Sequence, residues 1–365
     1  MDFRSLTGQE TVVDILRRTA DRDQLPNSYL FAGAEGVGKW AAALALTAYL
    51  NCRNQSNGDS CGQCPPCRQI EKLQFPNLHI AVPTPPSKSE KEEHENYWGI
   101  LNGKIEEPFS LITGKKMMSI PVAAVRAMRQ SLAQKPPVGG KRVVIIEQMD
   151  RMLTASADSL LKLVEEPPSQ TVIIITSSRP EKLLETIISR CRRIRFPQLP
   201  ESTVEKYMTK RTRLGAETSA LLARLSGGSI GRALYLSDDD NRQDREIGKV
   251  LFKGIFLADL AQVVAEAVEL LPLRDRFRVN RILGVWQSLF RDLMLLQSGA
   301  DTAAIINIDF AAELEKLAGQ AMNRKALLKI PAGLGEVITD IDLNVETKSA
   351  VGAAIINIHS QLQLT

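Results

Sequence analysis

The chain has 365 residues, 44% of them hydrophobic, which is enough for two or three domains that each bury a core. Its 46 basic and 42 acidic residues leave a net charge of +4, which permits contact with nucleic acid but does not argue for it. No apolar run approaches the roughly 20 residues that span a bilayer, and the first residues lack the plan of a signal peptide. We therefore expect a cytoplasmic protein whose five cysteines are thiols or metal ligands rather than disulfides.

Residues 1–196 have the pattern of an α/β unit. Four short apolar runs alternate with segments of helical spacing. Runs that are uniformly apolar suit strands buried on both faces of a parallel sheet, and the alternation predicts a doubly wound sheet. The expected strands are 29–32, 79–82, 142–146 and 171–176, and the expected helices lie near 39–51, 120–134, 154–165 and 180–189.

Two helical parts are expected after this unit. Residues 197–243 begin with the break Pro197-Gln198-Leu199-Pro200 and predict a small helical lid. Residues 244–365 are almost entirely helical in pattern and predict a separate collar-like bundle. One apolar helical face is expected at i, i+3, i+4 and i+7, formed by Leu257, Leu260, Ala261 and Val264.

Residues 84–117 differ in composition and are interpreted as an insertion. Three prolines precede a stretch dense in charge at 88–95. We expect an exposed excursion whose role the sequence does not reveal. Tyr97, Trp98 and Ile100 either anchor it to the domain or meet a partner, and anchoring fits the way compact loops pack.

A phosphate-binding loop is predicted at residues 33–40, Gly-Ala-Glu-Gly-Val-Gly-Lys-Trp, between the first strand and a helix. Gly33, Gly36 and Gly38 let backbone N–H groups surround phosphate oxygens, and Lys39 would reach the outer phosphates. The next position calls for Ser or Thr, whose hydroxyl binds Mg²⁺. Trp40 stands there, and an indole has no acceptor oxygen, so the cation loses a ligand.

A second defect follows the strand at 142–146. The usual pattern is an Asp for the metal and then a Glu that activates water, but this sequence has Glu147 and Gln148. Glu147 could still hold a cation, whereas the amide of Gln148 cannot accept a proton as a general base. The two defects predict that the site does not hydrolyse ATP. The alternative is that a local shift of the backbone lets Asp150 act as the general base. Whether ATP or ADP still binds is left open.

Three further motifs carry a family resemblance. Residues 6–10, Leu-Thr-Gly-Gln-Glu, resemble the start of clamp-loader AAA+ domains, and residues 160–168 resemble their leucine-lysine-glutamate-proline signature. Ser189, Arg190 and Cys191 match the serine-arginine-cysteine motif of the same group. Order and spacing agree across residues 1–235, whereas the C-terminal part resembles the family's helical collar only in kind.

This resemblance implies a subunit of a ring that opens a sliding clamp and places it on primed DNA. Its partners would be gamma/tau-type ATPase subunits, the delta subunit, the clamp and primer-template DNA, which is bound without sequence preference. Arg190 would be an arginine finger that completes the neighbouring subunit's ATP site in trans, a role that suits a planar and always charged group. The alternative is that Arg190 only pairs with a local carboxylate.

Within this family, the sequence favours the delta-prime type of bacterial DNA polymerase III subunit over the hydrolysing gamma/tau type. Trp40 and Gln148 are the first two reasons. The third is Gly231, which stands where gamma/tau subunits place a nucleotide-sensing arginine. Arg232, one residue later, would point about 100° away on a helix. A gamma/tau-type ATPase and a non-replicative AAA+ adaptor are the alternatives.

Four of the five cysteines are spaced C-x8-C-x2-C-x2-C, which predicts one structural zinc site without an open ligand position. An iron–sulfur cluster and redox disulfides are the alternatives. The expected ligands are Cys52, Cys61, Cys64 and Cys67. Cys191 is expected to be a small buried residue, and no metal role is assigned to His79, His94 or His359.

Basic residues gather at 190–195 and at Lys115 and Lys116. In the first group, Arg193 and Arg195 would share one face of a strand, opposite Arg192. These groups are either a solvated edge or contacts to DNA phosphates, and the sequence does not distinguish the two.

Overall fold

The computed structural model describes residues 2–22, 24–114, 117–152, 154–257, 259–320 and 323–362, without the side chains of 154–159. The chain forms two compact units. One comprises Met1–Leu214 with Ser226–Leu234, and the other comprises Gly215–Leu225 with Tyr235–Thr365. The domain limits at 196 and 243 that the sequence suggested stay predictions.

A five-stranded parallel sheet in the order β2-β3-β4-β1-β5 forms the centre of the first unit. β1, β3 and β4 are buried along their whole length, as their uniformly apolar sequences require. The four predicted strands are thereby confirmed to within a residue, and β5 forms one edge of the sheet. The strands are β1 Ser28–Ala32, β2 Leu78–Ala81, β3 Arg142–Ile146, β4 Thr171–Ser177 and β5 Arg192–Arg195.

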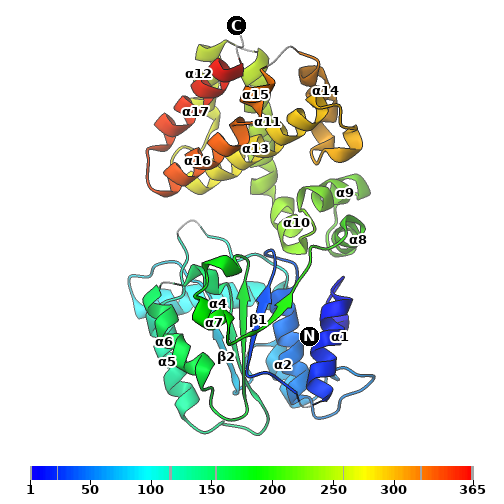
Figure 1. The fold of residues 1–365 in the computed structure, drawn as a ribbon, viewed down its shortest axis with the longest axis vertical. Coiled ribbons are helices and arrows are strands. Elements are labelled where there is room, and N and C mark those ends of the chain that lie inside the picture. Colours follow the sequence, from blue (N-terminus) through cyan, green and yellow to red (C-terminus); the bar gives the residue numbers. More distant parts are fainter. Residues whose placement is uncertain are drawn as a thin grey trace. The chain divides into compact units, whose positions relative to one another are not determined.

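Helices cover both faces of this sheet, which confirms the predicted doubly wound α/β class. Figure 1 shows α1 and α2 on one side of the strands and α5 and α6 on the other. The face toward α5 and α6 is apolar, with Val144, Ile146 and Ile173 packed against Val125 and Leu160. The helices of this unit are α1 Glu10–Asp21, α2 Lys39–Asn51, α3 Pro65–Glu71, α4 Glu90–Glu106, α5 Val122–Ala133, α6 Thr154–Glu165, α7 Glu185–Ile188 and α8 Glu201–Arg211.

The helix expected near 180–189 is interrupted. A 3-10 turn, Pro180–Lys182, is followed by extended backbone at Leu183 and Leu184 before the short α7 begins. Leu183 is buried in the core that also contains Leu160 and Leu163 of α6. The break in the helix thus coincides with the burial of this side chain.

The insertion at 84–117 is less exposed than the sequence suggested. Its helix α4 begins after Ser89, whose hydroxyl accepts a hydrogen bond from the N–H of Glu92 at 3.2 Å. The hydroxyl of Tyr97 donates to the carbonyl oxygen of Ile80 at 3.1 Å, so this residue anchors the insertion to β2, as predicted. The end of α4 and the segment after it are buried, at Leu101, Lys104, Phe109 and Ile112.

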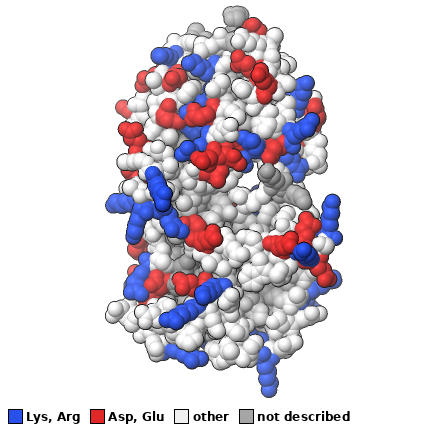
Figure 2. All heavy atoms as spheres, turned by 180° about the vertical axis from the view of Figure 1, so that it is seen from behind, with Lys and Arg blue, Asp and Glu red and all other residues white. Residues whose placement is uncertain are grey.

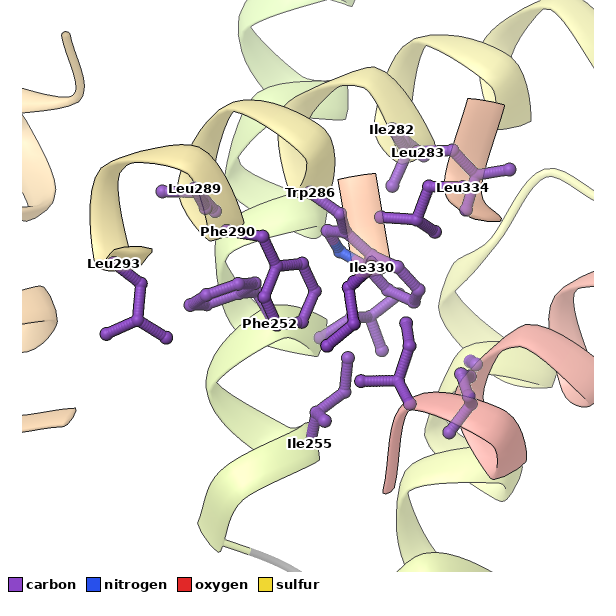
Figure 3. Close-up of a cluster of buried hydrophobic side chains, with 14 of the residues drawn as sticks. Phe252, Ile255, Ile282, Leu283, Trp286, Leu289, Phe290, Leu293, Ile330 and Leu334 are labelled. Carbon is purple, nitrogen blue, oxygen red and sulfur yellow. The ribbon is translucent and has the colours of Figure 1, made fainter. Parts of the chain in front are cut away.

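The second unit is helical, as predicted. Its core surrounds α13, where Phe252 and Phe290 pack with ring centres 4.8 Å apart beside the fully buried Trp286 (Figure 3). The indole nitrogen of Trp286 donates to the carbonyl oxygen of Gly248 at 2.9 Å. The helices are α9 Ala216–Leu225, α11 Asp239–Leu257, α12 Leu260–Leu270, α13 Arg276–Gln297, α14 Ala311–Ala318, α15 Arg324–Leu327, α16 Ile330–Asp342 and α17 Thr347–Leu362, and α10 Ile230–Ser237 belongs to both units.

The single apolar face predicted across 257–264 is wrong. α11 ends at Leu257, which is 61% exposed, and α12 begins only at Leu260. Asp259 is the N-cap of α12, because its side chain accepts from the N–H of Gln262 at 2.9 Å. The capping carboxylate ends the helical repeat that the apolar spacing suggested.

On the face drawn in Figure 2, basic and acidic side chains are interspersed without one dominant sign, in keeping with the small net charge. Among the helices that the structure describes, none is both long and apolar enough to cross a membrane. Lys115 and Lys116, one of the two predicted basic groups, lie outside the described residues.

We expect Trp286→Ala to lower the free energy of unfolding by about 3–5 kcal/mol, because it opens a cavity in the core of the second unit. Val250→Ala on α11 is the control, since that side chain is 54% exposed and its loss should change stability by less than about 0.5 kcal/mol. Urea unfolding followed by circular dichroism measures both. Equal effects of the two substitutions would contradict this assignment of the core.

Candidate nucleotide and metal sites

The predicted phosphate loop connects β1 to α2. Gly36 and Gly38 have φ angles of 74° and 107°, in the region that favours glycine, and Gly38 is the N-cap of α2. The N–H of Gly33 donates to the carbonyl oxygen of Ser177 at 3.2 Å, which fixes the start of the loop against β4. The sequence therefore correctly located a glycine-rich strand-to-helix turn.

The Lys39 ammonium turns back onto its own loop. Its Nζ donates to the carbonyl oxygens of Gly33 and Ala34 at 2.7 and 2.6 Å, and only 4% of the residue is exposed. Burial lowers the pKa of Lys39, and the nearby carboxylate of Glu147 opposes that shift. The amine that would reach a nucleotide's phosphates thus already has partners in the protein.

Trp40 fills the position of the expected hydroxyl. It is 2% exposed, and its indole nitrogen has no hydrogen-bond partner among the described residues. The ammonium of Lys104 lies 5.8 Å from the centre of a Trp40 ring, within the range of a cation–π contact. This position offers an aromatic face where a cation-binding hydroxyl would be.

Glu147 and Gln148 follow β3, as predicted, and both are buried. A carboxylate oxygen of Glu147 accepts from the hydroxyl of Thr176 at 2.7 Å, and the other lies 3.9 Å from Nζ of Lys104. Gln148 has a φ of 53°, its N–H donates to Thr176 Oγ1 at 2.9 Å, and its side-chain oxygen is unpartnered. The carboxylate that remains is therefore already neutralised by a lysine.

Asp150, the alternative base, is engaged elsewhere. Its carboxylate accepts from the Ser177 hydroxyl at 2.8 Å, from the Ser178 N–H at 3.1 Å and from Nε of Arg179 at 3.3 Å. Burial would raise the pKa of Asp150, but these hydrogen bonds outweigh it and hold the pKa below its ordinary value. Asp150 thus fixes the end of β4, which argues against a shift into the base's role.

Gly231 lies against the phosphate loop at the start of α10. Its N–H donates to the carbonyl oxygen of Gly36 at 3.0 Å. A Cβ at position 231 would come within 2.1 Å of the Phe109 carbonyl oxygen and 2.7 Å of the Gly36 Cα. No larger side chain fits there, and Arg232 is exposed.

Only a small cavity remains between these groups. Its volume is about 10 Å³, room for about one water molecule, whereas small-molecule sites occupy roughly 300–1,000 Å³. Part of its wall comes from the charged insertion, where nothing in the sequence marked those residues as part of a site. They are Lys104, Pro108, Phe109, Ser110 and Leu111.

The four predicted zinc ligands come together. The sulfur atoms of Cys52, Cys61, Cys64 and Cys67 all lie within 4.8 Å of one another. This arrangement fits a tetrahedral Zn²⁺, whose bonds of about 2.3 Å bring four thiolates within about 4 Å of each other. Backbone N–H groups of residues 63 and 64 donate to Sγ of Cys61 and lower its pKa to about 6, which favours the thiolate form at this cysteine, whereas burial raises the pKa of Cys52 and Cys67.

A carboxylate ties the cysteine loop to the start of the chain. Asp59 is 1% exposed and accepts from the N–H groups of Phe3 and Arg4, both at 3.1 Å. Cys191 is half-buried rather than fully buried as expected, and burial raises its pKa to about 11, which disfavours the thiolate form. Burial also lowers the pKa of His79, in keeping with a neutral, half-buried histidine on β2.

Arg190 lies between α7 and the edge strand β5, one residue after Ser189. Its guanidinium pairs with Glu165 at 2.9 Å and donates to the carbonyl oxygen of Thr186 at 2.9 Å, and 40% of its side chain is exposed. The local carboxylate partner considered from the sequence is therefore present. In β5, Ile194 is buried and the three arginines, Arg192, Arg193 and Arg195, are exposed.

Known proteins resemble this chain over much of its length. The family model described as "DNA polymerase III, delta subunit" matches residues 8–200, just over half of the chain. The DNA polymerase III subunit delta' of Bacillus subtilis (strain 168) is 26% identical over 301 residues, which cover 82% of this chain and 76% of that protein. The subunit delta' of Escherichia coli (strain K12) is 29% identical over 220 residues, 60% of this chain and 57% of that protein.

A tau/gamma subunit matches as well. The DNA polymerase III subunit tau/gamma of Haemophilus influenzae (strain ATCC 51907 / DSM 11121 / KW20 / Rd) is 27% identical over 300 residues. The match covers 79% of this chain but only 39% of that longer protein. The match thus spans about three quarters of the Bacillus subtilis delta' subunit and just over half of the Escherichia coli one. It spans about two fifths of the Haemophilus influenzae tau/gamma subunit.

We expect Cys64→Ser to remove the metal from a chain that otherwise contains about one zinc, because three thiolates and a hydroxyl bind Zn²⁺ more weakly than four thiolates. Elemental analysis measures the metal, and hydrogen exchange should show faster exchange at residues 52–67 and at Phe3 and Arg4. Cys191→Ser is the matched control, since that thiol lies outside the cluster. Wild-type protein that is purified without any zinc would contradict the assignment.

Proposed function

We propose a function from the premise that this chain belongs to the family described as DNA polymerase III, delta subunit. It acts as a delta-prime-like subunit of the clamp loader, the assembly that places a sliding clamp on primed DNA. Its partners are gamma/tau-type ATPase subunits, the delta subunit, the clamp and primer-template DNA. The AAA+ fold, with a parallel sheet and a helical C-terminal part, supports this role.

The subunit is proposed to be non-catalytic, and one observation carries that proposal. The groups needed to bind magnesium and activate water are replaced by a buried indole at Trp40 and a buried amide at Gln148. The packing around Gly231 supports the same conclusion, since it leaves no room for a nucleotide-sensing arginine. Asp150 supplies no substitute base, because its carboxylate is bound at the end of β4.

Arg190 is proposed to act on a neighbouring subunit. An ion pair as exposed as that with Glu165 contributes at most about 1 kcal/mol, so a more strongly charged partner can displace it. A γ-phosphate in a neighbour's ATP site is such a partner, and a planar guanidinium suits it. The exposed arginines of β5 are proposed to contact DNA phosphates without reading sequence.

The second candidate is a hydrolysing gamma/tau-type subunit, which the Haemophilus influenzae match favours. The two candidates differ in what the isolated chain does with ATP. A non-replicative adaptor, the third possibility considered from the sequence, is less compatible with the family match over residues 8–200.

We expect the purified chain alone to show no metal-dependent ATP hydrolysis, because it lacks both the cation ligand and the base. Lys39→Ala is the control that separates contamination from intrinsic activity, since trace hydrolysis by another protein would be unaffected by it. Steady phosphate release by the wild-type chain that Lys39→Ala abolishes would contradict the non-catalytic role and favour the gamma/tau-type reading.

In a reconstituted clamp loader, we expect Arg190→Ala to slow ATP hydrolysis by about 10³-fold at one site, the neighbouring site that receives the Arg190 side chain. Glu165→Ala is the matched variant: it breaks the same ion pair but leaves the arginine, so it should keep full activity. Arg126→Ala, an exposed arginine on α5, controls for the loss of surface charge. Clamp-loader ATPase that Arg190→Ala leaves unchanged, or that Glu165→Ala reduces equally, would remove the finger assignment.

A further inference from the structure

The end of the insertion lies across the phosphate loop. Residues 104–112, defined here as the strap, run from the last turn of α4 over the loop, and residues 108–111 line the small cavity together with Gly36 and Gly38. A Cβ on Gly38 would meet the Phe109 ring at 3.0 Å. The strap therefore touches the backbone that would otherwise surround phosphate oxygens.

Lys104 brings a positive charge into the same cavity. Its ammonium is 3.9 Å from a carboxylate oxygen of Glu147 and donates to the Ser110 carbonyl oxygen at 2.6 Å. The residue is 4% exposed, and a lysine buried to this degree needs a charged partner. In a hydrolysing site, the carboxylate at this position neutralises part of a magnesium ion's charge, and here it neutralises a lysine.

Two anchors hold the strap in place. On one side, Glu107 accepts from the Tyr207 hydroxyl at 2.9 Å and from Nε of Arg211 at 3.1 Å, both on α8, and the ring of Phe109 packs edge-on against Tyr207. On the other side, Arg151 pairs with Glu35 of the phosphate loop at 3.2 Å and donates to the Ile112 carbonyl oxygen at 3.4 Å.

We propose that the strap is a built-in ligand of this phosphate loop: Lys104 takes the place of the divalent cation at Glu147, and residues 108–111 take the space of the nucleotide's phosphates. The inference rests on the proposed non-catalytic role and extends it, because it also excludes nucleotide binding. A nucleotide can enter only when the strap has left, so the apparent affinity falls in proportion to the open fraction.

The test uses the full chain and a fluorescent ADP analogue with Mg²⁺, with binding followed by anisotropy. The outer variant, Tyr207→Phe with Arg211→Ala, releases the α8 anchor without touching the loop. The inner variant, Lys104→Met with Phe109→Ala, removes the parts that fill the cavity. Arg213→Ala is the matched control, an exposed arginine two residues beyond Arg211.

We expect the analogue to bind the outer or the inner variant at least about tenfold more tightly than the wild-type chain or the Arg213→Ala control. Adding Lys39→Ala should abolish the gain, and amide exchange at residues 107–111 should speed up in the outer variant. Circular dichroism checks folding, and should the inner variant not fold, the outer one decides, because Arg211 is exposed and Tyr207→Phe keeps the aromatic ring.

Two results would overturn the strap's role: a wild-type chain that binds the analogue as tightly as the variants, or folded variants that bind no better than the wild type. Neither result touches the proposed non-catalytic role, which fails if the wild-type chain hydrolyses ATP. Tight binding without hydrolysis therefore contradicts the strap alone.

Discussion

The rest of the site depends on how the buried carboxylate of Glu147 is neutralised. A carboxylate with 4% exposure at the end of a central strand has lost its hydration, so it needs a cation or hydrogen-bond donors close by. In a hydrolysing AAA+ subunit, nucleotide-bound magnesium supplies much of that positive charge. Here Lys104 and the hydroxyl of Thr176 supply it from the chain itself, so the site is satisfied without a ligand.

This constraint connects features that are distant in sequence. Lys104 reaches Glu147 only if the insertion folds back over the phosphate loop, and that path brings Phe109 against Gly38 and Gly231. The backbone at 231 must therefore be glycine, and the Trp40 ring faces the Lys104 ammonium. If the strap fills the site as proposed, the departures from the hydrolysing pattern are mutually consistent.

The features that a local sequence pattern determines could be predicted. Uniformly apolar runs located β1, β3 and β4, and the cysteine spacing located a cluster whose geometry fits zinc. Prediction failed where contacts are non-local, because nothing in a charged insertion indicates that Lys104 is buried beside Glu147. The new helix at Leu260 was a different failure, since the capping contact of Asp259 is local and the apolar spacing masked it. The sequence also could not place Arg190 beside Glu165, because that pair depends on the packing of α6 against α7.

A filled site changes what restoring single residues can achieve. Placing a hydroxyl at position 40 would return a metal ligand, yet Lys104 would still neutralise Glu147 and the strap would still occupy the cavity. A carboxylate at position 148 would add a second buried negative charge next to Glu147, and its desolvation would oppose ionisation until magnesium arrived. The strap must leave before either residue can act, so the proposed passivity of this subunit lies in its packing as much as in two missing functional groups.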